Sequence, residues 1–149
     1  MNRSPDLGAA LDRLPHGPDF RFVDRLLELE GGVRGAAEYT LRGDEPFLRG
    51  HFPGMPLMPG VLLIEAGAQL AGVVAQSDPA QPVLHGLKLA AVRQARIHGS
   101  LLPGQTVRLE AELLARMGGL VQARVRASLG ARILMEAEVA LGGSPVALA

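Results

Sequence analysis

The segment 60–76 constrains the fold of this chain more than any other stretch. Its sequence, GVLLIEAGAQLAGVVAQ, contains no proline, is rich in helix-forming residues and has no periodic polar face. This pattern predicts a helix buried on nearly all sides. The apolar run is shorter than the roughly 20 residues that span a bilayer, so we expect a core helix and no membrane partner. Other elements of the fold must therefore enclose it.

A β pattern dominates the last third of the chain. Apolar residues alternate with charged or polar ones over the segments 107–113, 121–127 and 133–139, with glycine-containing turns between them. This alternation predicts a three-stranded antiparallel meander with one apolar face. On its other face, arginines of the middle segment lie opposite glutamates of both neighbours, and such cross-strand pairs contribute roughly 0.2–1 kcal/mol each. We expect this charged face to be solvated.

Earlier segments add weaker strand patterns and a short helix. The sequences at 20–30, 33–41 and 83–99 read as strands or extended segments, and residues 5–13 predict a short helix. The total is five to six strands, mostly antiparallel, with one long apolar helix. Because an antiparallel sheet has one face to cover, we expect an α+β fold in which a strongly curved sheet wraps around the helix at 60–76.

The chain is 149 residues long, which is most simply a single domain with its own hydrophobic core. We place this domain at 1–142, with residues 1–13 as an N-terminal arm and 143–149 as a flexible C-terminal tail. The core must be aliphatic, because the chain has one tyrosine, four phenylalanines and no tryptophan. Such thin side chains, with 19 glycines, favour close backbone packing and a partner subunit that completes the burial.

Charge and composition argue against several functional classes. Fifteen basic and fifteen acidic residues balance, so bulk charge indicates neither nucleic-acid nor membrane-surface binding. The chain has no cysteine, which removes thiolate catalysis and cysteine-based metal sites. It also has no HExxH-type spacing, so we expect no metal site. The first residues, MNRSPDLGAA, lack the apolar core of a signal peptide, and we expect a cytoplasmic protein.

Candidate catalytic groups lie in and just before the apolar helix. His51 occupies the segment GHFPG, in which glycine and proline hold irregular backbone in a fixed shape. The first amides of the helix, at Gly60 and Val61, are unpaired donors at the positive end of the helix dipole and would polarise a carbonyl group. Glu65 and Gln69 are four residues apart, so they share one helix face and the amide can orient the carboxyl group.

These groups are the parts that an elimination next to a thioester requires. One group removes the α-proton, an acid in an apolar setting protonates the departing hydroxyl, and the amides hold the developing enolate. The structural alternatives are an ordinary loop histidine at His51 and a buried ion pair or hydrogen-bonded anchor at Glu65. The other histidines, His16, His85 and His98, have no metal-ligand spacing and are less informative.

Three segments of the chain resemble one enzyme family: LPHGPDFRFVDRLLEL (14–29), EPFLRGHFPGMPLMPGVLLIEAGAQLAG (45–72) and RIHGSLLPGQ (96–105). They are similar to the β-hydroxyacyl-acyl-carrier-protein dehydratases of the FabZ type, which are hot-dog-fold enzymes of bacterial fatty-acid synthesis. The resemblance implies the hot-dog fold and no cofactor. It also implies a substrate carried on the phosphopantetheine arm of acyl carrier protein.

By position, the resemblance assigns His51 as the base and Glu65 as the acid. The two come from opposite subunits of a homodimer, which in this family commonly assembles into a hexamer as a trimer of dimers. The amide of Gly60 becomes a donor to the thioester carbonyl, with Phe52 and Pro59 beside the substrate. The sister FabA type has aspartate in place of the glutamate and also isomerises the double bond, so the glutamate favours plain dehydration.

The sequence departs from the family pattern at several places. Residues 17–19, GPD, stand where the family usually has Arg-Tyr-Pro, and Leu48 stands in place of a phenylalanine. The segment 91–95 also differs, and aromatic residues that commonly gate the acyl tunnel are missing there. Acyl chain length and pathway therefore stay open, between housekeeping fatty-acid synthesis and a specialised lipid or polyketide pathway.

Acyl carrier proteins are acidic, so Lys88, Arg93 and Arg96 form a candidate docking rim, with Arg21 as a further candidate. Two alternative functions stay open. A hot-dog thioesterase would use an activated water in place of an α-proton base. A catalytically silent hot-dog subunit would bind acyl chains or pair with an active partner. Retention of both catalytic side chains argues against the silent subunit, and the altered segment 91–95 argues mildly for it.

Overall fold

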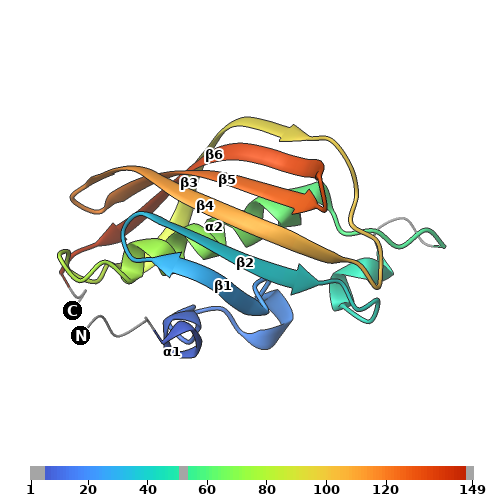
Figure 1. Cartoon of the computed structure of the whole chain (residues 1–149), viewed down its shortest axis with the longest axis horizontal. Coiled ribbons are helices and arrows are strands. Elements are labelled where there is room, and N and C mark those ends of the chain that lie inside the picture. Colours follow the sequence, from blue (N-terminus) through green and yellow to red (C-terminus); the bar gives the residue numbers. More distant parts are fainter. Residues whose placement is uncertain (1–5, 51–53, 147–149) are drawn as a thin grey trace.

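Figure 1 shows a computed structural model of the chain, which describes residues 6–50 and 54–146. Within these residues, six antiparallel strands form one sheet in the order β1-β2-β4-β5-β6-β3, and the long helix α2 packs against β2 to β6. The α+β hot-dog fold expected from the sequence is confirmed. The elements are α1 (Leu7–Leu11), the 3-10 turn η1 (Pro18–Phe20), β1 (Arg25–Glu30), β2 (Arg34–Thr40), the 3-10 turn η2 (Pro46–Arg49), α2 (Gly60–Gln76), β3 (His85–Ile97), β4 (Thr106–Met117), β5 (Leu120–Leu129) and β6 (Arg132–Ser144).

A glycine lets α2 approach the sheet closely. Leu63, Leu70 and Val74 of the helix are fully buried. A Cβ atom at Gly67 would lie only 2.8 Å from the Cβ atom of Val125 on β5, which is closer than packed carbon atoms approach. The helix backbone therefore lies nearer to β5 than a larger residue at this position would allow, as close packing of an aliphatic core requires.

One stripe of α2 is left open by the sheet. Val61 is 67% exposed, and Glu65, Gly72 and Gln76 are half-buried. Their spacing places them on one side of the helix. The expectation of burial on nearly all sides is therefore wrong for this stripe. The physical reason is the sheet order, because β3 is an edge strand and the described chain supplies no further strand beyond it.

Residues 20–24 are not part of a strand, although the sequence predicts one over 20–30. The strand β1 begins at Arg25, and η1 precedes it. The backbone N–H of Phe22 and the backbone carbonyl of Phe20 are instead bonded to the side chain of Gln69 on α2. A helix side chain thus takes the place of a neighbouring strand and ties the N-terminal segment to the core.

The other element bounds agree closely with the sequence pattern. The helix expected at 60–76 is α2 itself, and the predicted meander is formed by β4, β5 and β6. At the C-terminal end, β6 continues to Ser144, which is aligned with His85 on β3. The last strand therefore reaches two residues beyond the expected end of the domain at residue 142.

The outer face of the meander carries the cross-strand ion pairs expected from the sequence. Arg126 on β5 lies 3.1 Å from Glu110 on β4, and Arg124 lies 3.6 Å from Glu138 on β6. Both pairs are substantially exposed, so each contributes at most about 1 kcal/mol to stability. These charges form a solvated face that needs no functional explanation.

Candidate active site

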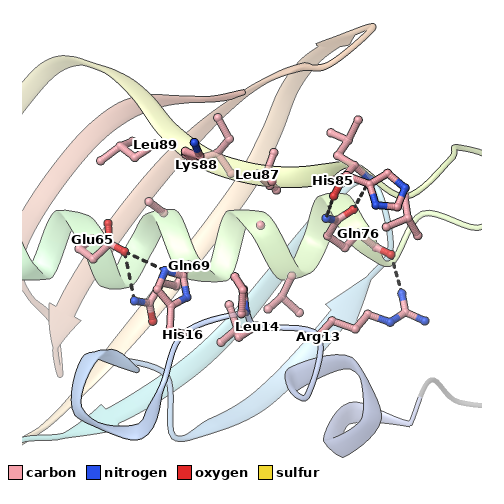
Figure 2. Close-up of a pocket in the computed structure, with 18 residues that line it drawn as sticks. Arg13, Leu14, His16, Glu65, Gln69, Gln76, His85, Leu87, Lys88 and Leu89 are labelled. Carbon is pink, nitrogen blue, oxygen red and sulfur yellow. Dashed lines mark hydrogen bonds and ion pairs between the residues drawn. The ribbon is translucent and has the colours of Figure 1, made fainter. Parts of the chain in front are cut away.

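A cavity of about 510 Å³ lies beside the open stripe of α2. The residues of α2 from Glu65 to Gln76 form one wall, and the segments 13–16 and 83–89 form the others (Figure 2). Much of the lining is apolar, and it includes Leu14, Ala68, Val73, Leu84, Leu87 and Leu141. A long apolar cavity with a few polar groups is the usual form of a site for a small or acyl ligand.

Gln69 organises the end of this cavity at which Glu65 lies. Its side chain is 3% exposed, and its Oε1 accepts a hydrogen bond of 2.8 Å from the backbone N–H of Phe22. Its Nε2 donates to the backbone carbonyl of Phe20 at 2.9 Å and to Oε1 of Glu65 at 3.2 Å. The backbone partners determine which end of the amide is the donor, so Gln69 orients the Glu65 carboxyl group as the sequence predicts.

Glu65 has a second neighbour, His16, which was not predicted to lie at this site. The His16 Nε2 lies 3.4 Å from Oε1 of Glu65, and the Glu65 side chain is 18% exposed. The other carboxyl oxygen, Oε2, has no bonded partner among the described residues. Figure 2 shows this oxygen pointing away from His16 and Gln69. In the sequence, His16 stands out only as part of the rigid segment Leu-Pro-His-Gly-Pro. This segment does not indicate which residue His16 contacts.

The helix N-terminus lies outside the cavity. Pro59, Gly60 and Val61 are absent from its lining, and the amides of Gly60 and Val61 make no hydrogen bond to any residue that the structure describes. A Cβ atom at Gly60 would lie 2.5 Å from Cδ1 of Ile97 on β3, so a larger residue at this position would require the Ile97 side chain to move. Along the helix axis, Gly60 is about 7.5 Å from Glu65.

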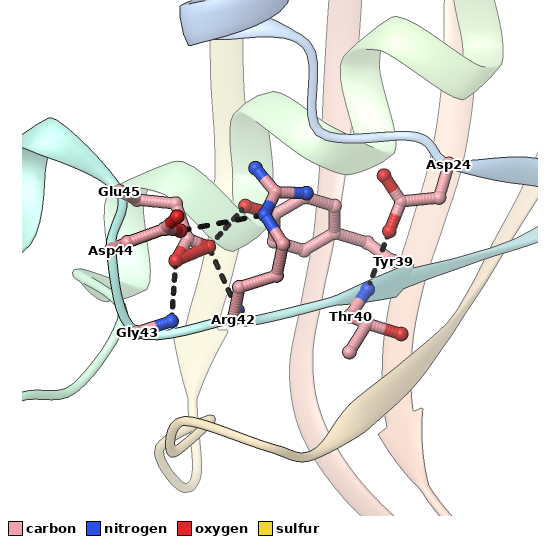
Figure 3. Close-up of polar contacts among 7 residues, drawn as sticks. All are labelled: Asp24, Tyr39, Thr40, Arg42, Gly43, Asp44 and Glu45. Carbon is pink, nitrogen blue, oxygen red and sulfur yellow. Dashed lines mark hydrogen bonds and ion pairs between the residues drawn. The ribbon is translucent and has the colours of Figure 1, made fainter.

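The two remaining predicted residues, His51 and Phe52, lie outside the described residues. The chain leading to them is held by Glu45, which is 5% exposed. The Glu45 carboxylate accepts hydrogen bonds from the backbone amides of Arg42 and Gly43 at 2.9 and 2.7 Å and from the Tyr39 hydroxyl at 3.1 Å (Figure 3). This cluster fixes the first part of the long loop between β2 and α2.

These contacts leave Glu45 ionised. Burial alone would raise the pKa of Glu45, but the backbone amides and the Tyr39 hydroxyl stabilise the carboxylate and lower its pKa below the ordinary value. Burial, with the negative charge of Glu45 beside it, raises the pKa of Tyr39, so the phenol stays protonated and continues to donate.

The candidate docking residues lie on β3 but do not form one compact patch. The side chains of Lys88, Arg93 and Arg96 are exposed and make no ion pair within the described part of the chain. Lys88 borders the cavity beside Glu65, whereas Arg93 borders a small hollow on the other side with Glu138. Arg21 donates to the carbonyl of Leu11 and thus has a structural partner.

Two kinds of feature are not found in the ranges 6–50 and 54–146. No cluster of three or more histidine, aspartate or glutamate side chains there is suited to hold a metal ion. None of the helices there is both long and apolar enough for a membrane crossing.

Known proteins resemble this chain in sequence over most of its length. The family model described as a FabA-like domain matches residues 14–138. The chain is 41% identical over 134 residues to the 3-hydroxyacyl-acyl-carrier-protein dehydratase FabZ of Desulforamulus reducens, an alignment that covers 90% of this chain and 94% of the relative. It is also 41% identical over 129 residues to the FabZ dehydratase of Chloroflexus aggregans, with 85% and 87% covered.

Solved structures share the fold at low sequence identity. The dehydratase heterocomplex ApeI:P from Xenorhabdus doucetiae superposes with a TM-score of 0.76 at 19% identity, covering 89% of this chain and 90% of that one. A mutant thioesterase from Pseudomonas aeruginosa superposes with a TM-score of 0.70 at 15% identity, covering 97% and 98%. A dehydratase and a thioesterase therefore share this fold, and the fold alone does not decide between the two activities.

Proposed function

The chain belongs to the FabA-like family as a dehydratase of the FabZ type, and from this premise we propose that it dehydrates β-hydroxyacyl thioesters of acyl carrier protein to trans-2-enoyl thioesters. The reaction serves fatty-acid synthesis or a related specialised lipid or polyketide pathway. The observation that carries the proposal is the half-buried Glu65 carboxyl at one end of a long apolar cavity. An acyl chain suits such a cavity, and a carboxyl group beside it suits acid chemistry.

Glu65 is assigned the role of general acid. Its Oε1 accepts a hydrogen bond from Gln69, so in the protonated acid the O–H group lies on Oε2, which has no partner among the described residues. This proton passes to the β-hydroxyl group of the substrate, which leaves as water when the Cβ–O bond breaks.

His51 is assigned the role of base, on the strength of its position in the GHFPG motif. It takes the α-proton, and the electrons of the Cα–H bond form the new carbon–carbon double bond. The amide of Gly60, with Val61 behind it, holds the thioester oxygen as negative charge develops. Phe52 and Pro59 lie beside the reacting part of the substrate in this assignment. Proton transfer from the His51 imidazolium to the Glu65 carboxylate, through water, restores the starting state.

The active unit is a homodimer in which the two catalytic side chains come from different chains. The edge strand β3 is 13 residues long, and its side chains include the exposed Leu89, Val92 and Ile97. A long edge strand with exposed apolar side chains, next to an open helix stripe, favours pairing with a second chain. Such a pairing supports a site built from Glu65 of one chain and His51 of the partner subunit. Three such dimers can assemble into a hexamer, as is common in this family.

Acyl carrier protein is the expected partner, and its phosphopantetheine arm delivers the acyl chain without a further cofactor. Lys88, Arg93 and Arg96 on β3 are exposed and form no ion pair among the described residues, which supports docking of an acidic protein on this strand. Lys88 is the strongest candidate because it also borders the cavity.

The test is incubation of the protein with β-hydroxyacyl and trans-2-enoyl carrier-protein thioesters of several chain lengths, following enoyl absorbance and free thiol together. We expect the two thioesters to interconvert without release of thiol. The variant Glu65→Gln keeps the shape of the side chain but cannot donate a carboxylic-acid proton. It should lower kcat by about 10²–10⁴-fold while leaving the melting temperature close to that of the wild type.

Two outcomes would contradict the proposal. Release of thiol without interconversion would favour a thioesterase, in which an activated water attacks the thioester. Binding of acyl thioesters by a folded protein, with neither reaction, would favour a silent acyl-binding subunit. Full dehydratase activity in Glu65→Gln would overturn the role of Glu65 and leave the reaction itself intact.

A further inference from the structure

We propose that His16 is a positioning residue for Glu65. The His16 Nε2 lies 3.4 Å from Oε1 of Glu65, the same oxygen to which Gln69 Nε2 donates at 3.2 Å (Figure 2). Two nitrogens from different parts of the chain thus face one carboxyl oxygen and leave Oε2 for chemistry. The inference rests on the proposed function, since it gives His16 a part in the action of Glu65 as an acid.

The segment that carries His16 is held in place on both sides. Pro15 and Pro18 fix the backbone φ angle at their positions. Gln69 fixes the backbone at 20–22, because its side chain donates to the backbone carbonyl of Phe20 and accepts from the backbone N–H of Phe22. The imidazole therefore approaches the carboxyl from backbone that is tied to the same helix.

His16 serves no other polar partner in the described part of the protein. Its Nδ1 is buried and has no hydrogen-bond partner there. A proton on Nε2 gives Glu65 a donor, whereas a proton on Nδ1 would bury an N–H group without an acceptor. The other charged or titratable side chains around the cavity are Arg13, His85 and Lys88. None of these three makes an ion pair with Glu65 within the described residues.

Holding Oε1 from two directions decides which oxygen reacts. A carboxyl group bonded to Gln69 alone can rotate and present either oxygen to the substrate. With the His16 nitrogen also 3.4 Å from Oε1, the reactive oxygen keeps one position. Because a misplacement of about 1 Å costs on the order of 10²-fold in rate, the effect of His16 falls on turnover and leaves substrate binding nearly unchanged.

The test compares His16→Ala and His16→Gln with His98→Ala as the matched control. His98 Nε2 lies 3.3 Å from Oε2 of Glu136 in an exposed pair away from the cavity, so this control removes a similar contact. We expect His16→Ala to lower kcat by about 10- to 100-fold with little change in KM, and His98→Ala to change neither. His16→Gln should restore much of kcat, because its amide nitrogen is as many bonds from Cβ as the imidazole Nε2.

A second measurement does not depend on turnover. Nitrogen-15 NMR of the imidazole rings should place the proton of His16 on Nε2, and Glu65→Ala should shift the His16 signals while those of His98 stay in place. Unchanged His16 signals in Glu65→Ala would overturn the inference, and so would full kcat in a folded His16→Ala variant. If Glu65→Gln retains full activity, the proposed role of Glu65 fails, while the NMR result still decides whether His16 holds this carboxyl.

Discussion

Two carboxyl groups of this protein, Glu45 and Glu65, have very different surroundings. Glu45 accepts hydrogen bonds from two backbone amides and a tyrosine hydroxyl, which satisfy both of its oxygens and keep it ionised. Among the described residues, Glu65 is hydrogen-bonded through one oxygen, and the other oxygen is open to a cavity. The first arrangement suits a structural anchor and the second suits proton transfer, so the number of donors separates the two roles.

The anchor at Glu45 should make the stability of the protein depend on pH. Its pKa in the folded protein is lowered from the ordinary value of 4.5, so its contribution is present above pH 4.5 and is lost as the pH falls through the lower, folded-state pKa. We expect Glu45→Gln to reduce the free energy of unfolding by about 1–3 kcal/mol near pH 7, and the difference from the wild type to shrink in acid. Urea unfolding at several pH values measures this.

The exposed Glu112 supplies the control for this prediction. It has no ion pair within the described residues, so Glu112→Gln should leave the free energy of unfolding nearly unchanged at every pH. A difference between Glu45→Gln and the wild type that stayed constant from neutral to acid pH would show that the charge of Glu45 is not what anchors the loop.

At the scale of elements, the long helix and the meander were predictable because local and global signals agree there. The segment 60–76 contains no proline, and α2 spans the same residues. The alternation over 107–113 likewise falls within β4. Residues 20–24 carry strand-forming side chains but are bonded to a helix side chain instead, and no local pattern contains that information.

The side chains of the candidate site were predictable only in part, for a related reason. Glu65 and Gln69 lie on one element, so their helical spacing was enough to pair them. His16 reaches Glu65 from a segment 49 residues away in the sequence, and its position depends on the fold of the N-terminal segment. Contacts of this kind follow from tertiary packing and have no periodic signature in the chain.

The contact between α2 and β5 should tolerate no larger residue than glycine at position 67. Alanine is favoured over glycine in a helix by about 1 kcal/mol, but a Cβ atom at Gly67 would lie 2.8 Å from the Val125 Cβ, and overpacking typically costs about 1–3 kcal/mol. We therefore expect Gly67→Ala to lower the free energy of unfolding and the melting temperature.

Gly72 on the same helix is the matched control. The nearest atom to a Cβ there is 3.6 Å away, on Leu87, which is ordinary contact. Gly72→Ala should therefore raise the free energy of unfolding by about 0.5–1 kcal/mol. A gain of stability in both variants would show that α2 can shift away from β5 at little cost.

At the scale of the whole molecule, two open surfaces lie on the same side of the fold. The stripe of α2 that carries Glu65 borders the cavity, and so does the beginning of β3, from His85 to Leu89. The sheet ends at β3, so the described chain leaves this side uncovered. A second chain paired along β3 would extend the sheet and cover the open stripe, and the cavity would become an enclosed site between subunits.

A site shared between chains predicts complementation between two inactive variants. His51→Ala and Glu65→Ala homodimers each lack one catalytic side chain at both sites. In a mixed dimer, the intact Glu65 of the first variant meets the intact His51 of the second, so one of the two sites is complete. If chains re-pair at random, half of the dimers are mixed, and we expect about one quarter of the wild-type activity after unfolding and refolding the variants together. Light scattering should show that the wild type and both variants have the same mass. If both side chains came from one chain, no mixed dimer would contain a complete site, and the mixture would stay as inactive as its components.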